Sequence, residues 1–141
     1  AGSNRAKLHF RVEGDGDVRN TNNSYGQLSD EKLKQDIVDA SSQWEDIKAV
    51  KVKKFRFKDD VTNLGADKAI LQIGVVAQDL EAAGMSGLVK DTPDVIDNVD
   101  QGTVTKSVKY SVLYMKAIKA LQEAQVRIET LETKVEALEA K

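Results

Sequence analysis

The chain has no cysteine, one proline and few aromatic residues, namely one Trp, three Tyr and three Phe among 141 residues. Without cysteine, disulfide bonds and thiolate metal sites are excluded. So few aromatic side chains argue against a large independent hydrophobic core, and oligomerisation is a common remedy for a small one. The length fits one ordinary domain, or a small domain with extensions.

A strong charge of either sign is also missing, because 21 basic side chains stand against 23 acidic ones. Nucleic-acid binding requires a clustered basic face. The one basic run, residues 48–58, interleaves Lys and Arg with Val and Phe. A nucleic-acid-binding strand has this pattern, but an ordinary amphipathic strand with a solvated face explains it better. We therefore expect no nucleic-acid partner.

Long apolar runs and ligand-binding motifs are lacking too. No run approaches the about 20 apolar residues that span a bilayer, and no signal-peptide pattern is present, so we expect a soluble protein without a membrane partner. Asp15 and Asp17 suggest a calcium loop, but the further oxygen ligands of such a loop are missing. Turn formation by Gly and Asp explains them better. We expect no metal, cofactor or small-molecule ligand.

Residues 1–28 differ in character from the rest of the chain. Leu8, Phe10 and Val12 alternate with polar residues, which predicts a half-buried strand over 7–12. A turn over 13–17, a second short strand at 18–19 and a polar loop over 20–24 follow. His9, the only histidine, lies on the polar side of the first strand, where surface or inter-chain packing is favoured over catalysis. So small a hairpin cannot form a core alone and needs partner chains or more upstream chain.

From Asp30 the spacing of apolar residues becomes helical. Leu33, Ile37 and Val38 recur at helical intervals after two acidic residues that favour a helix start, so we predict a helix from residue 30. A short helix capped by Ser41 and Ser42 is expected next, running through Trp44 and Ile47 to Lys48. It is followed by a strand over 50–57, a polar connection over 59–68 and a short apolar run over 70–73. The last elements expected before residue 110 are a helix over 75–83 that stops at Gly84 and an extended hairpin with strands at 94–98 and 103–109.

The last segment carries the clearest periodicity. From about Tyr110 there is no Gly or Pro, and apolar residues fall on a 3-4 spacing, which predicts a left-handed coiled coil over about 110–141. The expected seam consists of Leu121, Ala124, Ile128, Leu131, Val135 and Leu138, with Arg127 and Lys134 at g positions and Glu132 and Glu139 at e positions. A single amphipathic helix on a globular core is the alternative, but the narrow stripe and its charged flanks disfavour it. The fold class expected is therefore α+β and mainly helical, with an N-terminal β stub, a hairpin-like protrusion and a long C-terminal coiled-coil helix.

Ser29 and Lys34, in the segment QLSDEKLK, are the residues that could carry chemistry. Taken locally, a Ser before Asp-Glu is typical of a helix N-cap. A Ser and a Lys five residues apart are also too common to indicate a protease.

Four stretches nevertheless resemble one family. Ser29-Asp30-x-Lys32-Leu33-Lys34 is similar to the Ser-Asp-x-Arg-Leu-Lys signature of the C-terminal intramolecular chaperones of phage tailspikes and tail fibres, the endosialidase-type auto-processing domains. Residues 47–57 follow, then IGVVAQDLE over 73–81, close to the family's Ile-Gly-x-Ile-Ala-Gln-Asp-x-Glu, then VKYSVL over 108–113 and the coiled coil. The resemblance covers residue 29 to about 125. Lys32 departs from the family's usual Arg. Lysine keeps the positive charge but lacks the planar guanidinium group of arginine.

The resemblance implies a homotrimer in which residues 1–28 are the C-terminal end of a passenger tail fibre or tailspike and 29–141 are its chaperone. The chaperone would template the folding of its own passenger, then release itself as a single-turnover serine peptidase. Ser29 would be the nucleophile and Lys34 its base, which requires burial or a nearby cation to lower the pKa of the lysine. These steps would take place in the host cytoplasm, and the passenger would join the virion tail.

The bond that is cut has two candidates. Attack of Ser29 Oγ on the preceding carbonyl is a five-membered N→O shift that would break Leu28–Ser29, the favoured bond. A serine from a neighbouring subunit would instead cut Ser29–Asp30.

A different function is a structural trimerisation tip of a fibre, which never cleaves and in which Ser29 is merely a cap. A third setting, a membrane-tethered transcription factor of animals, needs a DNA-binding region and a membrane helix. Neither lies in these residues, and the end at Lys141 favours the phage setting.

Overall fold

The computed structural model describes residues 10–14, 17–21 and 25–141. Parts of the expected N-terminal hairpin lie outside these residues, namely strand positions 7–9 with His9, Asp15 of the turn, and positions 22–24 of the polar loop. The chain divides into two compact units, residues 1–39 and 40–141.

In the first unit, the predicted hairpin is confirmed within the described residues. Strand β1 (Phe10–Val12) pairs antiparallel with β2 (Val18–Asn20), and Arg11 lies opposite Arg19. The hydroxyl of Tyr25 donates to the carbonyl of Val18 at 3.0 Å and ties the following chain to β2. The apolar side chains of both strands are exposed, as expected of a hairpin too small to enclose a core.

The helix predicted from residue 30 is wrong. Only one 3-10 turn forms, η1 (Glu31–Leu33), and no residue between it and position 44 is helical. Leu33, Ile37 and Val38 are 60, 62 and 84% exposed. Helical spacing stabilises a helix chiefly through burial of its apolar face, and within the described residues these side chains are left uncovered. Asp36 adopts a positive φ of 55°, which a continuing helix does not allow.

The second unit begins with the predicted short helix. Helix α1 (Trp44–Ala49) has Gln43 rather than a serine at its N-cap, although Ser42 Oγ still accepts from the Trp44 N–H at 3.3 Å. The strand expected over 50–57 shortens to β3 (Lys53–Phe55), and it pairs antiparallel with β4 (Gln72–Gly74) from the expected apolar run.

Between these strands lies a helix that the sequence reading missed. Residues expected to form a polar connection fold as α2 (Lys58–Leu64), which ends at Gly65 with φ of 85°. Asp59 and Asp60 occupy its first turn, where the helix dipole favours acids. Only Val61 and Leu64 provide an apolar pair at helical spacing, which is too short a pattern to distinguish a helix from a loop.

The core of the second unit is small and aliphatic. It consists of Leu80, Met85, Leu88 and Leu113, whose exposed fractions are 1–8%. Leu80 comes from α3 (Ala77–Ala82), the predicted helix that stops at Gly84, and Leu88 comes from the 3-10 turn η2 (Ser86–Leu88). No aromatic side chain is among these four, in keeping with the composition.

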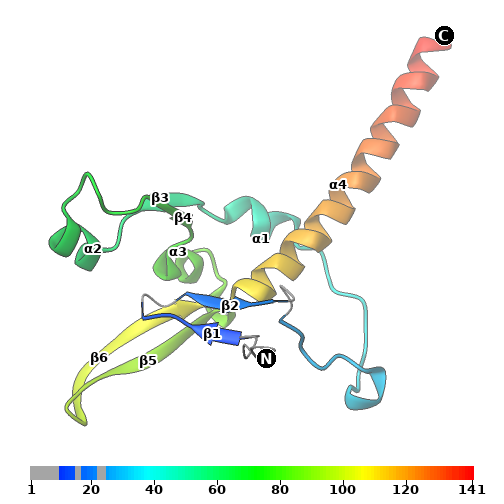
Figure 1. Ribbon diagram of the computed structural model, residues 1–141. Helices are drawn as coiled ribbons and strands as arrows, with labels where there is room; N and C mark the ends of the chain where they lie inside the picture. Colours follow the sequence, from blue (N-terminus) through cyan, green and yellow to red (C-terminus); the bar gives the residue numbers. More distant parts are fainter. Residues whose placement is uncertain (1–9, 15–16, 22–24) are drawn as a thin grey trace, which may run out of the picture. The chain divides into compact units, whose positions relative to one another are not determined.

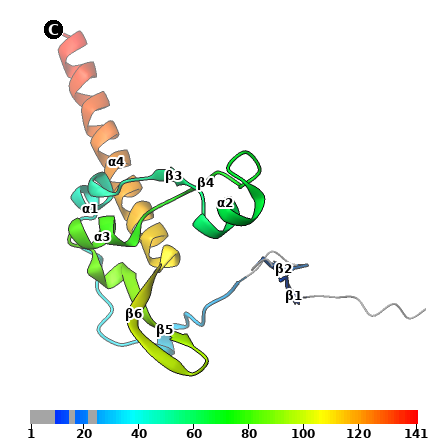
Figure 2. The ribbon, with the colours of Figure 1, turned by 90° about the vertical axis from the view of Figure 1, so that its left-hand side faces the viewer.

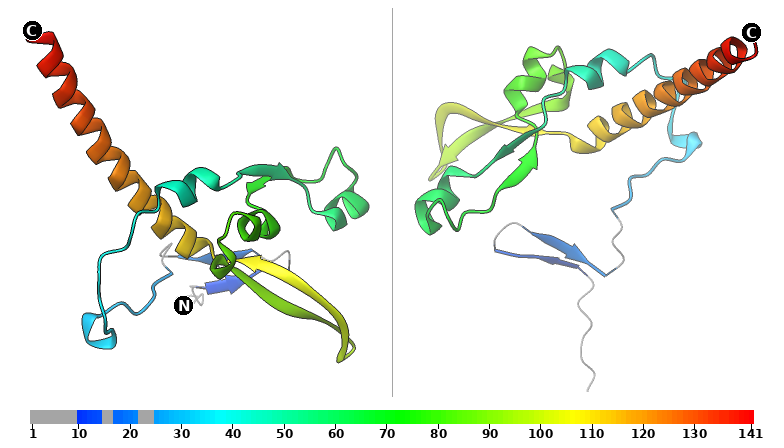
Figure 3. Two further views of the ribbon diagram at one scale, coloured as in Figure 1. Left: turned by 180° about the vertical axis from the view of Figure 1, so that it is seen from behind. Right: turned by 90° about the horizontal axis from the view of Figure 1, so that it is seen from above.

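The predicted protrusion is confirmed as a hairpin, but its strands are longer than expected, and its turn at 97–98 lies within what was predicted as the first strand. Strands β5 (Val89–Ile96) and β6 (Val99–Val108) form an antiparallel hairpin. Asp97 and Asn98 form its two-residue turn, and both take positive φ, the backbone conformation that tight hairpin turns need. The hairpin leads directly into the terminal helix (Figure 3).

The terminal helix, α4 (Tyr110–Glu139), is confirmed as one unbroken helix of 30 residues (Figure 1). Helix α1 lies against its first half, where Leu113 and Ala120 are buried (Figure 2). The larger side chains of the expected seam, from Leu121 to Leu138, are 50–69% exposed. The coiled coil stays a prediction. Within the described residues, none of the helices combines the length and apolarity that a membrane crossing requires.

Candidate active site

The first unit brings Ser29 and Lys34 together. Lys34 Nζ donates a hydrogen bond to Ser29 Oγ at 2.6 Å, and both residues are exposed. The distance lies within the range of a charge-assisted hydrogen bond. The two side chains that the family signature marks as nucleophile and base are therefore already in contact in a single chain.

The turn between them provides this proximity. The N–H of Leu33 donates to the carbonyl of Asp30 at 3.1 Å, and the N–H of Lys34 donates to the carbonyl of Glu31 at 2.9 Å. These two bonds define η1. The chain beyond Lys34 returns to extended geometry, so the lysine is the first residue after the turn.

The residue that caps the turn is Asp30, and the expectation that Ser29 is a helix cap is wrong. Asp30 Oδ1 accepts from the N–H of Lys32 at 3.0 Å, and Asp30 Oδ2 lies 3.4 Å from Lys32 Nζ. Because the aspartate takes the capping position, the hydroxyl oxygen of Ser29 is left for Lys34.

The chemical capacity of the pair depends on the protonation of Lys34. A serine hydroxyl is a weak nucleophile until an adjacent base accepts its proton. A lysine ammonium has three donors and no lone pair, so it can only donate to Ser29, whereas the neutral amine can accept. Lys34 is exposed to water in the single chain. The neighbouring Leu28 is 85% exposed, so the chain on the N-terminal side of Ser29 is open as well.

The third family-like stretch, residues 73–81, does not carry chemistry of this kind but organises the second unit. A Cβ on Gly74 would lie 2.8 Å from Tyr110 Oη and 3.2 Å from Phe55 Cε1. The same Tyr110 hydroxyl accepts from the N–H of Val75 at 3.3 Å. Glycine is therefore required where the tyrosine of the VKYSVL stretch meets β4.

Two acidic residues of the same stretch form ion pairs with lysines of β3 and β6. Asp79 Oδ2 is buried and forms an ion pair with Lys53 at 2.5 Å, although the angles are not those of a hydrogen bond. Glu81 Oε1 accepts from Lys106 Nζ at 2.9 Å, and Asp91 Oδ1 accepts from the same amine at 2.8 Å. The carboxylate of Asp91, followed by that of Glu81, raises the pKa of Lys106. These contacts were not foreseen, because residues 15 to 26 positions apart give no local signal.

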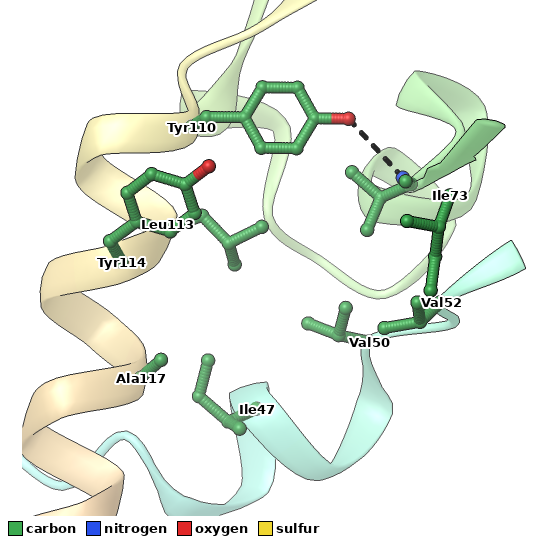
Figure 4. A pocket seen from close by; sticks show the side chains of 10 residues that line it. Ile47, Val50, Val52, Ile73, Tyr110, Leu113, Tyr114 and Ala117 are labelled. Atoms are coloured by element: carbon green, nitrogen blue, oxygen red, sulfur yellow. Dashed lines mark hydrogen bonds between the residues drawn. The ribbon is translucent and has the colours of Figure 1, made fainter.

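An apolar groove of about 360 Å³ runs between α1, β4 and the start of α4 (Figure 4). Its walls are almost wholly apolar, and the Tyr110 hydroxyl at its rim is occupied by the bond to Val75. Beside it, Trp44, Leu121 and Ala124 line a second hollow that leads onto the expected seam. The Arg127 guanidinium lies 3.9 Å from the centre of the Trp44 ring. Among the described residues, no cluster of His, Cys, Asp or Glu could hold a metal ion.

Comparison with known proteins identifies one family. No curated protein matches the chain. A family model described as chaperone of endosialidase, Peptidase_S74, matches residues 29–90, a segment that starts at Ser29 and includes the turn, the paired β3 and β4 strands and the whole 73–81 stretch. The VKYSVL stretch and α4 lie beyond the match. Residues 29–90 of this chain are therefore similar to the family described as chaperone of endosialidase, Peptidase_S74.

Proposed function

We propose that this chain is an intramolecular chaperone that assembles its passenger as a trimer and then cuts itself free through Ser29 and Lys34. The observation that carries the proposal is the 2.6 Å contact between Lys34 Nζ and Ser29 Oγ at the start of the family-matched segment. The passenger would be a phage tail fibre or tailspike whose last residues are 1–28. The trimer would assemble in the host cytoplasm, and the passenger would become part of the virion tail.

The proposed reaction needs no group beyond this chain and water. Lys34, as the neutral amine, takes the proton of Ser29 Oγ while the oxygen attacks the carbonyl carbon of Leu28. The C–N bond between Leu28 and Ser29 breaks, the lysine returns the proton to the leaving amine, and an ester links Leu28 to Ser29 Oγ. Water then hydrolyses the ester and restores the serine hydroxyl. A serine of a neighbouring subunit acting on Ser29–Asp30 is the second candidate.

Assembly would control the timing of this reaction. The pair is exposed in one chain, and burial of a lysine in a packed interface favours its neutral form. The uncovered seam of α4 supplies an apolar face for such packing, because large apolar side chains at 3-4 spacing rarely remain in water over four turns. Three chains held together raise the effective concentration of passenger strands, which lowers the cost of their slow non-local pairing.

The competing function is a trimerisation tip that never cleaves. The exposure of both side chains in the single chain favours this alternative, because nothing buries the pair before assembly within the described residues. The two functions differ in one covalent bond, so a measurement of product mass separates them.

The test expresses the chain both alone and fused behind a folded trimeric fibre, followed by denaturing gels and intact-mass spectrometry. We expect a fragment of residues 29–141, or of 30–141 if the second bond is cut, and no fragment from Ser29→Ala or Lys34→Ala. Glu31→Ala, an exposed neighbour in the same turn, serves as the matched control and should cleave like the wild type. An assembled trimer that stays whole in both settings would overturn the proposal in favour of the structural tip.

A further inference from the structure

We infer that Asp30 is a positioning residue for the self-cleavage, because its side chain closes the turn that holds Lys34 against Ser29. The inference rests on the proposed function with its favoured bond, Leu28–Ser29, for which Asp30 supplies none of the reacting atoms. Its support lies in the length of chain between the pair, in the few bonds that hold the turn, and in the partners of the Asp30 carboxylate.

Ser29 and Lys34 meet only because the chain between them is turned. An extended chain advances about 3.3–3.6 Å per residue, so five residues would separate their Cα atoms by about 17 Å. That span exceeds the reach of a lysine side chain toward a serine hydroxyl. A 3-10 turn advances about 2.0 Å per residue, and the 2.6 Å contact therefore depends on η1.

Few interactions hold this turn. Two backbone hydrogen bonds close it, from Leu33 and Lys34, and the third bond is the one from the Lys32 N–H to Asp30 Oδ1. None of its residues is buried, so packing within the unit does not stabilise it. A single short turn is marginal by itself, since nucleation fixes several dihedral angles for few bonds. Loss of the Asp30 acceptor removes one of three bonds and leaves an N–H without its partner.

The capping role of Asp30 also keeps Ser29 available. A serine immediately before a turn ordinarily uses its own hydroxyl oxygen as the cap. Here the next residue accepts the backbone N–H, so Ser29 Oγ bonds to Lys34 instead. The cap and the nucleophile are thus two adjacent residues with separate tasks.

The carboxylate of Asp30 forms an ion pair with Lys32, whereas Lys34 bonds to Ser29. The distance from Asp30 Oδ2 to Lys32 Nζ is 3.4 Å. Acceptance of a backbone N–H does not require a charge, because an amide or hydroxyl oxygen caps as well as a carboxylate. The positioning therefore acts through hydrogen-bond acceptance, and a neutral acceptor should preserve it.

The experiment compares Asp30→Ala, Asp30→Asn and Asp30→Ser in the whole chain, in whichever setting the wild type cleaves. Appearance of the C-terminal fragment is timed by quantitative mass spectrometry on trimers isolated by size exclusion. We expect Asp30→Ala to slow cleavage about five- to thirty-fold, the range that the loss of a cap produces. Asp30→Asn and Asp30→Ser should restore the rate to within about three-fold of the wild type. Glu31→Ala removes a neighbouring charge with no cap and should leave the rate unchanged.

The outcomes separate this inference from the proposed function. If the wild type cleaves and Ser29→Ala does not, but Asp30→Ala cleaves at the wild-type rate, the positioning role is overturned and the autoprotease stands. An Asp30→Asn variant as slow as Asp30→Ala would show that the carboxylate charge is needed, which also overturns it. A Ser29→Ala chain that cleaves normally overturns the proposed function itself. Because Asp30 is exposed, all three variants should assemble, and the isolation of trimers verifies this.

Discussion

At the scale of the residue, Gly74 and Tyr110 fit each other as a pair. Gly74 and Tyr110 belong to two different family-like stretches and are 36 positions apart in the sequence. The tyrosine hydroxyl nevertheless occupies the space that a Cβ on Gly74 would take. Gly74→Ala should destabilise the chain by about 1–3 kcal/mol, the usual cost of forcing an extra methyl into a filled site. The free energy of unfolding from urea titration measures this effect.

Tyr110→Phe should partly rescue Gly74→Ala, because it removes the atom 2.8 Å from the added Cβ while Phe55 stays at 3.2 Å. A double-mutant cycle then yields a favourable coupling, whereas additive losses would show that the two residues do not compete for the same space. Gly87→Ala is the matched control. Nothing lies within 4 Å of its Cβ position, so its unfolding free energy should stay near that of the wild type.

At the scale of the element, the β5–β6 hairpin carries two groups whose pKa depends on folding. The Thr105 hydroxyl, then that of Thr103, lowers the pKa of Asp94 through hydrogen bonds of 2.6 and 2.7 Å. Stability from a depressed carboxyl is present above the pH at which an unfolded Asp titrates, roughly 4. It is lost as the pH falls through the folded pKa. The pKa of Lys106 is shifted in the opposite direction, upward. Its contribution to stability is therefore present below the pH at which an ordinary lysine titrates, and it is lost as the pH rises through the raised pKa.

We therefore predict that acid loosens the hairpin before it disturbs α4. Hydrogen-exchange protection of β5 and β6, followed from neutral pH into acid, should fall more steeply in the wild type than in Asp94→Asn, which has no charge to lose at that position. Asp97→Asn in the exposed turn controls for the removal of an acid from the same hairpin. Equal acid dependence in the wild type and in Asp94→Asn would contradict the prediction.

The elements also show where sequence reasoning succeeds and where it stops. The hairpin β5–β6 and helix α4 were predicted because their signals are long, with turn residues between two strands and thirty positions without Gly or Pro. The helix expected from residue 30 failed because Leu33, Ile37 and Val38 stay exposed among the described residues, so burial does not stabilise a helical face. Helix α2 was missed because seven residues with one apolar pair give too little pattern.

The candidate site was likewise predicted in part from the sequence and missed in part. Ser29 and Lys34 were found through the family signature, since local spacing alone favoured a helix cap. The capping role of Asp30 was not found, because which of two adjacent polar residues caps a turn depends on backbone dihedral angles that sequence does not fix. The contact of Tyr110 with Gly74 and Val75 was likewise hidden, since it joins segments that are distant in the sequence.

At the scale of the whole molecule, assembly through α4 should control both oligomeric state and self-cleavage. Val135 lies on the expected seam and Val126 lies off it on the same helix, and both are at least half exposed in the single chain. Val135→Asp would bury a charge between helices, which strongly disfavours association. Val126→Asp makes the identical chemical change on the solvent side. We expect the first variant to sediment as a monomer and to lose the fragment of residues 29–141, and the second to behave like the wild type.

This pair of variants also separates assembly from folding. The seam lies beyond the buried part of α4, so an aspartate at position 135 leaves the core around Leu80 and Leu113 untouched. Its near-ultraviolet circular dichroism, which reports the packing of aromatic residues such as Tyr110 against β4, should match the wild type while the sedimentation coefficient falls. A Val135→Asp chain that stays monomeric yet cleaves at the wild-type rate would show that one chain neutralises Lys34 unaided, and burial in a trimer would then play no part in activating the serine.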